Sequence, residues 1–180
     1  LERTNARHFA DFVLRQTGAR ALLAGGTRVA SAANGVDAEL PGGRLCFPSL
    51  TYNSAALYSS DFVSFYDKVH LVPFGEYIPG DKIFPRLQKL APVGSCTPGE
   101  LKLLALGDVR LGVAICYEDT DSAQIRRLAQ LGADVLVFIT NDSWFSFSDE
   151  TVQHAWQSVA RAIETGLPVV RVGNSGVTGT

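Results

Sequence analysis

The chain alternates between segments whose apolar residues recur at helical spacing and short apolar runs that are typical of strands. Helical spacing over the first 18 residues predicts a helix, with Thr4 or Asn5 as its cap and Gly18 at its end. Two further helices are predicted over residues 121–131 and 150–165. The predicted strands cover residues 21–25, 52–58, 62–66, 101–106, 110–116, 133–140 and 168–172, with a hairpin turn at Gly107-Asp108.

This alternation of strands and helices favours an α/β sandwich that carries helices on one or both sheet faces. No internal repeat or linker divides the chain, so residues 1–180 are expected to form one domain. Residues 30–50 are predicted to be a loop or a poorly paired hairpin. The segment 68–98 contains five prolines, which predicts an irregular loop. Loops of that length inside compact domains are usually functional.

The amino-acid composition excludes several classes of protein. Apolar residues make up 46% of the chain, charged residues 19%, and the net charge is −2, so a disordered chain is excluded. Lysine and arginine are scattered, which argues against a nucleic-acid partner. No apolar run approaches the about 20 residues of a membrane helix, which predicts a globular domain without a membrane span of its own. No spacing of metal ligands or phosphate-binding glycines occurs, and no cofactor is expected.

A strand that ends in a cysteine is the sharpest local feature. Residues 112–115 are followed directly by Cys116, Tyr117, Glu118 and Asp119. Ligand sites of open α/β sheets form at the carboxyl ends of strands. A thiol there, close to a helix N-terminus, is favoured as a thiolate nucleophile. The alternative interpretation is a buried cysteine that only fills space in the strand.

Lys68, His70 and Glu76 begin the long irregular segment just after a predicted strand. A lysine close to a cysteine stabilises the thiolate and can donate to a developing oxyanion, and Glu76 could orient that lysine or relay a proton. Lys68 on its own could equally be a solvated surface residue. For His70, packing or capping is the simpler interpretation, because nothing in the sequence places it against Cys116.

A third polar segment follows the next strand after the cysteine strand. It contains Asn141, Asp142, Trp144 and Phe145. Asn141 and Asp142 could cap or turn the chain, and the two aromatic residues could belong to the core. Because the segment follows a neighbouring strand, it could also line the same rim as Cys116.

Taken in order, these segments resemble the nitrilase, or carbon–nitrogen hydrolase, superfamily, and within it the apolipoprotein N-acyltransferases. The resemblance extends from about residue 8 to the end of the chain. It rests on four co-linear groups of residues: Tyr66-Asp67-Lys68 with 70–79, Ile115-Cys116-Tyr117-Glu118, 140–145 with Gln153-His154, and 174–178.

The resemblance implies an αββα sandwich and a Glu-Lys-Cys catalytic set. Cys116 would be the nucleophile and Lys68 the lysine that stabilises the oxyanion, with Glu76 and Glu118 as supporting carboxylates. Tyr117, Asn141, Trp144 and Phe145 would line the substrate site. A phospholipid would donate a fatty acyl chain to the thiol, and the N-terminal amine of a lipoprotein would accept it. The implied location is the bacterial inner membrane, on its periplasmic face, with the membrane reached through segments outside this chain.

The chain also departs from the pattern. The family's general base is a glutamate on a strand before the first helix, and no counterpart occurs here; Glu2 is interpreted as an ordinary carboxylate of the first helical turn. The fold is therefore expected to be incomplete at its N-terminus and C-terminus, and residues 1–180 alone to be inactive. The segment 146–150 lacks a glycine that the family usually has.

Two other functions remain open at this stage. A cytoplasmic carbon–nitrogen hydrolase would use the same cysteine and lysine on a small amide or nitrile. An inactive nitrilase-fold module would only bind or scaffold. In an oxidising periplasm, Cys46 and Cys96 could form a disulfide and leave Cys116 free.

Overall fold

The computed structural model describes residues 2–31, 49–80, 83–84, 86, 96–145 and 148–180. Its helices are α1 (Glu2–Thr17), α2 (Ser122–Gln130) and α3 (Glu150–Thr165), and two short 3₁₀ turns are η2 (Cys116–Thr120) and η3 (Asp142–Phe145). Its strands are β1 (Ala21–Ser31), β2 (Ser49–Ser59), β3 (Val63–Asp67), β4 (Leu104–Leu106), β5 (Val109–Ile115), β6 (Val135–Thr140) and β7 (Val169–Gly173).

The strands of the described residues form two sheets. The first is antiparallel, in the order β1-β2-β3, with Ala55 opposite Tyr66. The second has the order β4-β5-β6-β7, where β4 and β5 form an antiparallel hairpin and β5, β6 and β7 run parallel. Parallel strands end at the same edge of a sheet, so the segments that follow β5, β6 and β7 meet at one rim.

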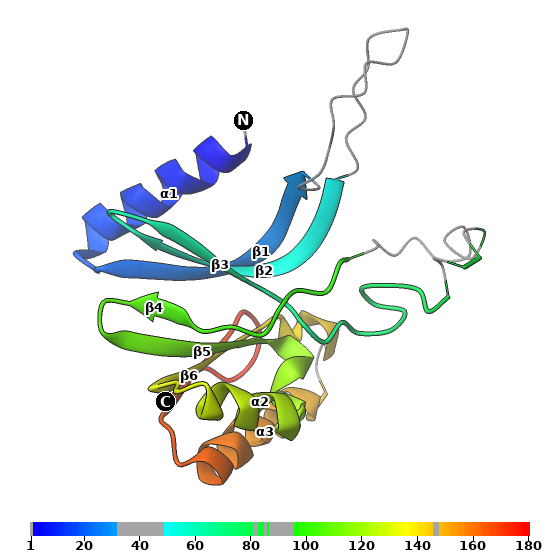
Figure 1. Ribbon diagram of the computed structural model, residues 1–180. Coiled ribbons are helices and arrows are strands. Elements are labelled where there is room, and N and C mark those ends of the chain that lie inside the picture. The colour runs from blue at the N-terminus through cyan, green and yellow to red at the C-terminus, as the bar shows by residue number, and fades with distance from the viewer. Residues whose placement is uncertain (1, 32–48, 81–82, 85, 87–95, 146–147) are drawn as a thin grey trace, which may run out of the picture.

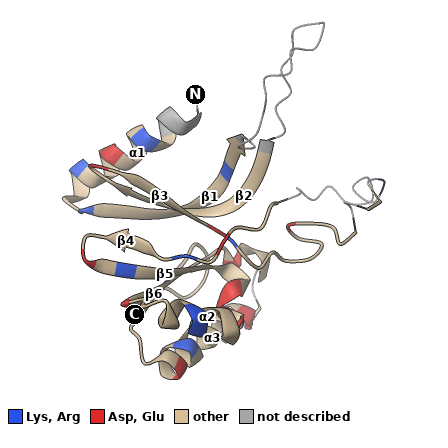
Figure 2. Cartoon of the chain, in the orientation of Figure 1, with Lys and Arg blue, Asp and Glu red and all other residues tan. Residues whose placement is uncertain are grey.

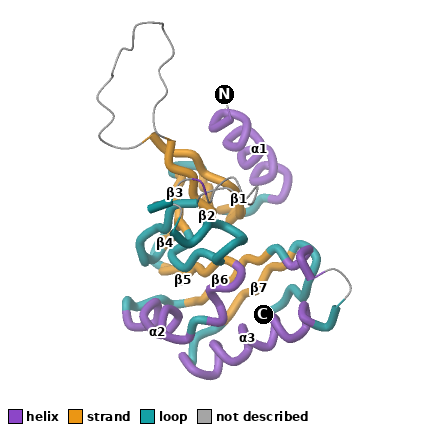
Figure 3. The backbone as a smooth tube through the Cα atoms, turned by 90° about the vertical axis from the view of Figure 1, so that its right-hand side faces the viewer, coloured by secondary structure: helices purple, strands orange, loops and turns teal. Residues whose placement is uncertain are grey.

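The two sheets pack face to face, and helices cover their outer faces (Figure 1). Side chains from both sheets form the core between them, namely Ala55, Leu57, Tyr66, Leu104, Leu111, Val113 and Ile115. A second core lies between β6 and α2, where Ile125 and Leu128 pack against Leu136 and Phe138. In Figure 3, α1 lies on one side of the sandwich, and α2 and α3 lie on the other. The layers are therefore helix, sheet, sheet, helix, as the resemblance implied.

Most predicted elements are present, with corrections at their ends. Helix α1 begins at Glu2, so Thr4 and Asn5 lie inside it and do not cap it, whereas Gly18 ends it in a left-handed conformation with φ 68°. Strand β1 extends to Ser31 because it pairs with β2 along its whole length, which includes part of the predicted 30–50 loop. Residues 32–48 of that loop lie outside the described residues.

The second half of the chain follows its predicted pattern more closely. The Gly107-Asp108 turn joins β4 to β5, although β4 is shorter than predicted and residues 101–103 lie outside it. Asp121 caps α2 by accepting hydrogen bonds from the N–H groups of Ala123 and Gln124. Gly166 ends α3 with φ 68°. In the described ranges 68–80 and 96–98, no helix or strand is assigned, in keeping with the predicted irregular loop.

Charged positions of both signs are distributed over the molecule, and acidic positions occupy the turn between β5 and α2 (Figure 2). In the ranges that the structure describes, none of the helices combines the length and the apolar character needed to cross a bilayer.

Candidate active site at the carboxyl ends of the parallel strands

Cys116 follows the last residue of β5 and begins the turn η2. Its backbone φ is 53°, in the left-handed region that residues with a Cβ seldom adopt. Backbone strain of this kind concentrates at functional sites, where the surrounding contacts maintain it. The thiol of Cys116 is partly buried and carries no disulfide. The structure thus places this cysteine at the carboxyl end of its strand, as the sequence predicted, but in the turn after β5 rather than within the predicted strand 110–116.

Glu118 is fully buried two residues later and holds this turn in place. Its Oε2 accepts a hydrogen bond from the N–H of Ile115 at 2.8 Å, and its Oε1 accepts one from the N–H of Val69 at 2.7 Å. These two donors are the direct sequence neighbours of Cys116 and Lys68. One carboxylate therefore joins the two segments that carry the predicted nucleophile and the predicted lysine.

Tyr66 supports Glu118 from the core between the sheets. Its hydroxyl lies 3.1 Å from both carboxylate oxygens and accepts a hydrogen bond from Nε2 of Gln124 at 3.0 Å. Burial, followed by the charge of Glu118, raises the pKa of the Tyr66 phenol far above its ordinary value. The raised pKa favours the protonated phenol, which can donate its hydrogen to Glu118.

Lys68 follows β3 directly, and 1% of its side chain is exposed. Its Nζ donates to both oxygens of Glu76, at 3.0 and 2.9 Å. Glu76 also accepts from Nδ2 of Asn53 at 2.6 Å and from the N–H of Val72 at 2.7 Å. The predicted partnership between this lysine and Glu76 is thus present, and the solvated-surface interpretation of Lys68 is wrong. Among the described residues, no hydrogen bond joins Nζ of Lys68 to the Cys116 thiol.

Tight backbone contacts fix the segments around this ion pair. The N–H of Gly99 donates to the carbonyl of Lys68 at 2.8 Å, and the N–H of Cys96 donates to the carbonyl of Glu76 at 2.8 Å. Burial and the nearby Glu76 carboxylate raise the pKa of the Cys96 thiol, which is free in the structure. Cys46 lies outside the described residues, so the predicted Cys46–Cys96 disulfide stays a prediction.

The predicted substrate residues lie on η2 and η3, or beside them at the rim. Tyr117 is 60% exposed and Trp144 is 79% exposed, so the core interpretation of Trp144 is wrong. Phe145 is partly buried and packs edge-on against His154, with their ring centroids 5.8 Å apart. Asn141 accepts hydrogen bonds from the backbone of Ser143 and from Nδ2 of Asn174. The rim therefore offers two accessible aromatic side chains and an amide close to the nucleophile turn.

His70 contacts Asp121 and Glu118, and among the described residues no hydrogen bond joins it to Cys116. Its imidazole pairs with Asp121, and its backbone N–H donates to Glu118 at 3.1 Å. The His70 side chain is exposed and engaged with Asp121, which supports a local structural role for this histidine.

The structure also brings together buried polar residues that the sequence analysis did not single out as a group: Asp119, Asp142, His154, Ser158 and Arg171. In the sequence, Asp119 only follows the cysteine strand, and Asp142 could cap or turn the chain. A charged residue inside an otherwise apolar strand, as Arg171 is in β7, was the signal that could have indicated them.

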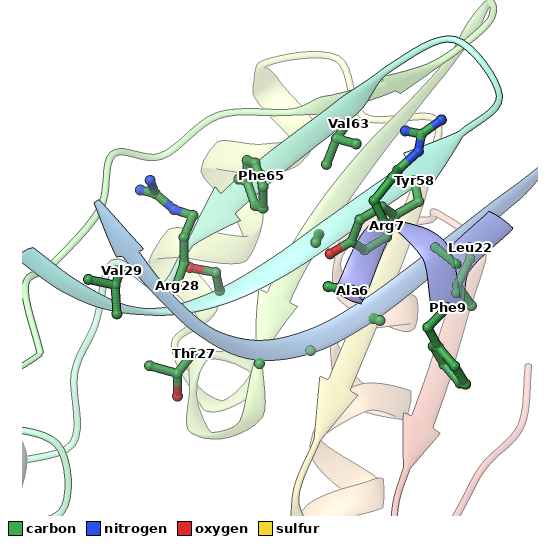
Figure 4. Close-up of a pocket in the computed structure, with 16 residues that line it drawn as sticks. Ala6, Arg7, Phe9, Leu22, Thr27, Arg28, Val29, Tyr58, Val63 and Phe65 are labelled. Atoms are coloured by element: carbon green, nitrogen blue, oxygen red, sulfur yellow. The ribbon is translucent and has the colours of Figure 1, made fainter. Parts of the chain in front are cut away.

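A separate cavity of about 660 Å³ lies away from these residues, between α1 and the outer face of the first sheet (Figure 4). Ala56, Tyr58 and Phe65 line it, whereas Leu57 and Tyr66 point to the opposite face and into the core. Alternation along the strands therefore separates this cavity from the predicted catalytic residues, none of which lines it.

Comparison with known proteins places this geometry in a family. Residues 27–180 match the family model described as carbon-nitrogen hydrolase. The chain belongs to the carbon–nitrogen hydrolase family. The match includes both segments that Glu118 joins and all three strands whose carboxyl ends form the rim.

Curated relatives of this carbon–nitrogen hydrolase chain include the apolipoprotein N-acyltransferase of Geobacter metallireducens, 42% identical over 130 residues. That alignment covers 70% of this chain and 25% of the relative. The enzyme of the same name from Sinorhizobium medicae is 36% identical over 155 residues, with 81% of this chain and 28% of the relative covered. The chain thus spans about a quarter of the length of these relatives.

Solved structures support the fold. The amidase from Nesterenkonia sp. AN1 matches with a TM-score of 0.58 at 23% identity, over 94% of this chain and 54% of that chain. A mutant of that amidase, solved with acrylamide added to its active-site cysteine, matches with a TM-score of 0.58 at 24% identity, over the same shares of the two chains. The fold of the present chain is accordingly nitrilase-like.

Proposed function

We propose that this chain is the catalytic domain of an apolipoprotein N-acyltransferase. It would move a fatty acyl chain from a phospholipid, through a thioester on Cys116, to the N-terminal amine of a lipoprotein. The observation that carries the proposal is the double contact of Glu118, which ties the Cys116 turn to the Lys68 segment. The relatives of that name, 36–42% identical over 130 and 155 residues, supply the substrate class.

In the first step the Cys116 thiolate attacks the ester carbonyl of the donor lipid. A C–S bond forms and the carbonyl oxygen becomes an oxyanion, which the Lys68 ammonium would stabilise. When the oxyanion collapses, the C–O ester bond breaks, and the lysophospholipid leaves as an alcohol by taking up the proton that the Cys116 thiol lost on becoming a thiolate. Glu76 holds Lys68 through both of its oxygens, so the ammonium has a fixed direction before the lipid arrives.

In the second step the amine of the lipoprotein attacks the thioester carbonyl. A C–N bond forms, the amine loses a proton, and the C–S bond breaks to release the thiolate. A covalent intermediate divides one difficult acyl transfer into two easier ones, so ping-pong kinetics are expected. Tyr117, Asn141, Trp144 and Phe145 would bind the acyl chain and the acceptor at the rim.

The proposal includes a Glu-Lys-Cys catalytic set. Cys116 and Lys68 supply two of its members, and Glu76 and Glu118 act as supporting carboxylates. The base glutamate of the resemblance has no counterpart in residues 1–180. We therefore expect this stretch alone to be inactive, and the protein at its natural length to act at the bacterial inner membrane with its catalytic domain on the periplasmic face.

The test is detection of the thioester. The protein at its natural length is incubated with phospholipid vesicles, and the Cys116 peptide is examined by mass spectrometry for a fatty acyl adduct. We expect the adduct on Cys116 and its loss in Cys116→Ser, while Cys96→Ser retains it. An unmodified, intact Cys116 after prolonged incubation would reject the acyltransferase.

The fold neighbours support one alternative, a carbon–nitrogen hydrolase in which water resolves the thioester. Release of ammonia from small amides, lost in Cys116→Ser, would favour it. Transfer of an acyl chain to a lipidated N-terminal peptide amine, without release of free fatty acid, would favour the acyltransferase.

A further inference from the structure

Four buried charged residues from four elements meet behind the rim. Asp119 comes from η2, Asp142 from η3, His154 from α3 and Arg171 from β7. Both aspartates have no exposed surface, and the histidine and arginine are 8% and 4% exposed. We call these four residues the buried ring. Burial of so many charges is costly unless each finds a partner, so their arrangement requires an explanation.

Ion pairs join each aspartate of the ring to each of its two basic side chains. Arg171 donates to Asp119 at 2.7 Å and to Asp142 at 3.1 Å. His154 lies 2.9 Å from Asp119 through Nε2 and 2.9 Å from Asp142 through Nδ1. Each aspartate therefore contacts both cationic side chains. Further hydrogen bonds come from Ser158 to Asp119 and from Thr140 to Asp142.

This geometry fits a protonated His154. Both ring nitrogens face carboxylate oxygens, and only the imidazolium form donates to both. Nη2 of Arg171 also lies 3.0 Å from Nδ1, so a neutral Nδ1 would accept from Arg171 instead of donating to Asp142. Burial disfavours that charge and Arg171 repels it. The hydrogen bonds and charge of Asp119, with the hydrogen bond of Asp142, outweigh these effects and raise the pKa of His154. With His154 protonated, two positive and two negative charges balance inside the ring.

Each aspartate belongs to a turn that carries predicted site residues. Asp119 lies on the five-residue turn that begins with Cys116, and Asp142 lies on the turn that contains Trp144 and Phe145. Phe145 also packs edge-on against the His154 ring. The ring is thus the shared anchor of the nucleophile turn and the aromatic rim, although no ring member is placed in the chemistry itself.

We propose that the buried ring of Asp119, Asp142, His154 and Arg171 is a positioning unit, which holds the Cys116 turn and the Asn141–Phe145 rim in one fixed relation as long as His154 is protonated. The proposal deepens the proposed function, since it names what aligns the thiol with the acyl chain. When His154 loses its proton, its Nδ1 no longer donates to Asp142. Arg171 is then the one ring member that still bridges the two aspartates, so the relation between the η2 and η3 turns loosens.

The test compares His154→Gln with the wild-type protein at its natural length across a range of pH. Two rates are measured: alkylation of Cys116 by iodoacetamide, read from its peptide by mass spectrometry, and acyl transfer. Glutamine keeps a polar side chain but lacks the charge and the second donor. We expect His154→Gln to slow acyl transfer on the order of 10²-fold near neutral pH, the size of loss that misplacement of a reacting group causes. The ratio of the wild-type rate to the variant rate should fall toward one as the pH rises through the raised pKa of His154, because the wild-type protein then also lacks the donor from His154 to Asp142.

The controls lie in the same chain. His8→Gln makes the same change at an exposed position of α1 and should match the wild type. Alkylation of Cys96, which lies outside both turns, should be the same in all variants. A folded His154→Gln protein whose Cys116 alkylation matches the wild type at every pH would overturn the proposal, as would a loss of acyl transfer that does not change with pH.

A milder variant keeps the proposal testable if His154→Gln does not fold. Thr140→Val removes only the hydroxyl that donates to Asp142 at 2.7 Å. It should alter Cys116 alkylation relative to Cys96, and an unchanged ratio would also overturn the proposal. Alkylation needs no acyl donor. If the variants alter Cys116 alkylation but the wild-type protein shows no acyl transfer, the proposed function is rejected and the positioning unit still stands.

Discussion

The left-handed backbone of Cys116 is maintained by contacts on both sides of the residue. A non-glycine residue in this conformation costs about 1–3 kcal/mol, and Glu118 offsets that cost by binding the N–H of Ile115 on one side and that of Val69 across the sandwich. The residue that presents the thiol is therefore held by a neighbour that has no exposed surface.

The first residue-scale prediction concerns Glu118→Gln. An amide keeps one acceptor oxygen but turns an NH₂ group toward backbone N–H donors, which leaves donors unpaired in the core. Hydrogen bonds to buried charged groups contribute about 1.5–3 kcal/mol each, so the free energy of unfolding should fall by about 3 kcal/mol in chemical denaturation. Glu100→Gln, the same change at an exposed site, should have no such effect. Equal stability of the two variants would contradict the anchoring role of Glu118.

The second prediction concerns Lys68→Ala. Loss of the ammonium should reduce acyl transfer by about 10²-fold or more, as removal of an oxyanion donor does in other enzymes. It also leaves Glu76 without its cationic partner, so some loss of stability is expected. Lys102→Ala removes an exposed lysine and should alter neither quantity. Initial rates and thermal unfolding of the three proteins separate the two effects.

At the scale of elements, periodicity predicted the positions of the helices and most strands, because each has one apolar face and one polar face. It could not predict that β1 continues to Ser31, since that extension depends on pairing with a distant strand. It also could not predict the start of α1 or the shortness of β4, because the ends of elements depend on local hydrogen bonds.

The site was predictable where its residues are adjacent in sequence or belong to a family motif. Cys116 and Glu118 share one turn, and the resemblance brought Lys68 together with Glu76. The buried ring was not predictable, because its members lie between residues 119 and 171 and each one has an ordinary local interpretation. Only tertiary packing shows that Asp119 faces Arg171.

The element-scale prediction is Gly99→Ala. A Cβ at residue 99 would overlap the backbone of Asp67 at the end of β3, just before Lys68. Overpacking of this kind costs about 1–3 kcal/mol, and here it should also displace Lys68 and lower activity. Gly26→Ala is the matched control, because its added methyl group meets nothing within 4 Å. Chemical denaturation of both variants, together with their acyl-transfer rates, provides the check.

At the scale of the whole molecule, buried charges set the pH range of stability. Burial opposes ionisation of Asp67, but the hydrogen bonds from Arg28 and Ser54 and the charge of Arg28 outweigh it and lower its pKa; the pKa of Asp142 is lowered as well. The stability that these carboxylates contribute is present above their ordinary pKa and is lost as the pH falls through the lowered values. His154 has the opposite sign, because its pKa is raised: its contribution is present below its ordinary pKa and is lost as the pH rises through the raised value.

The whole-molecule prediction follows from these signs. The free energy of unfolding should be greatest at intermediate pH. It should fall at acid pH, where the carboxylates become protonated, and at alkaline pH, where His154 loses its proton. Asp67→Asn should reduce the acid-side slope, and His154→Gln should reduce the alkaline-side slope. Chemical denaturation at a series of pH values measures both slopes. A slope that is unchanged in its matching variant would show that the named residue does not set that limit.

The position of Arg171 has a consequence for biosynthesis. Arg171 lies on β7, which follows every other strand and helix of the chain, yet it completes the ring behind the Cys116 turn. A ribosome releases this arginine more than fifty residues after the cysteine. A nascent or truncated chain therefore carries the thiol before it carries the residue that aligns it, and the site cannot acquire its final geometry until translation has passed β7.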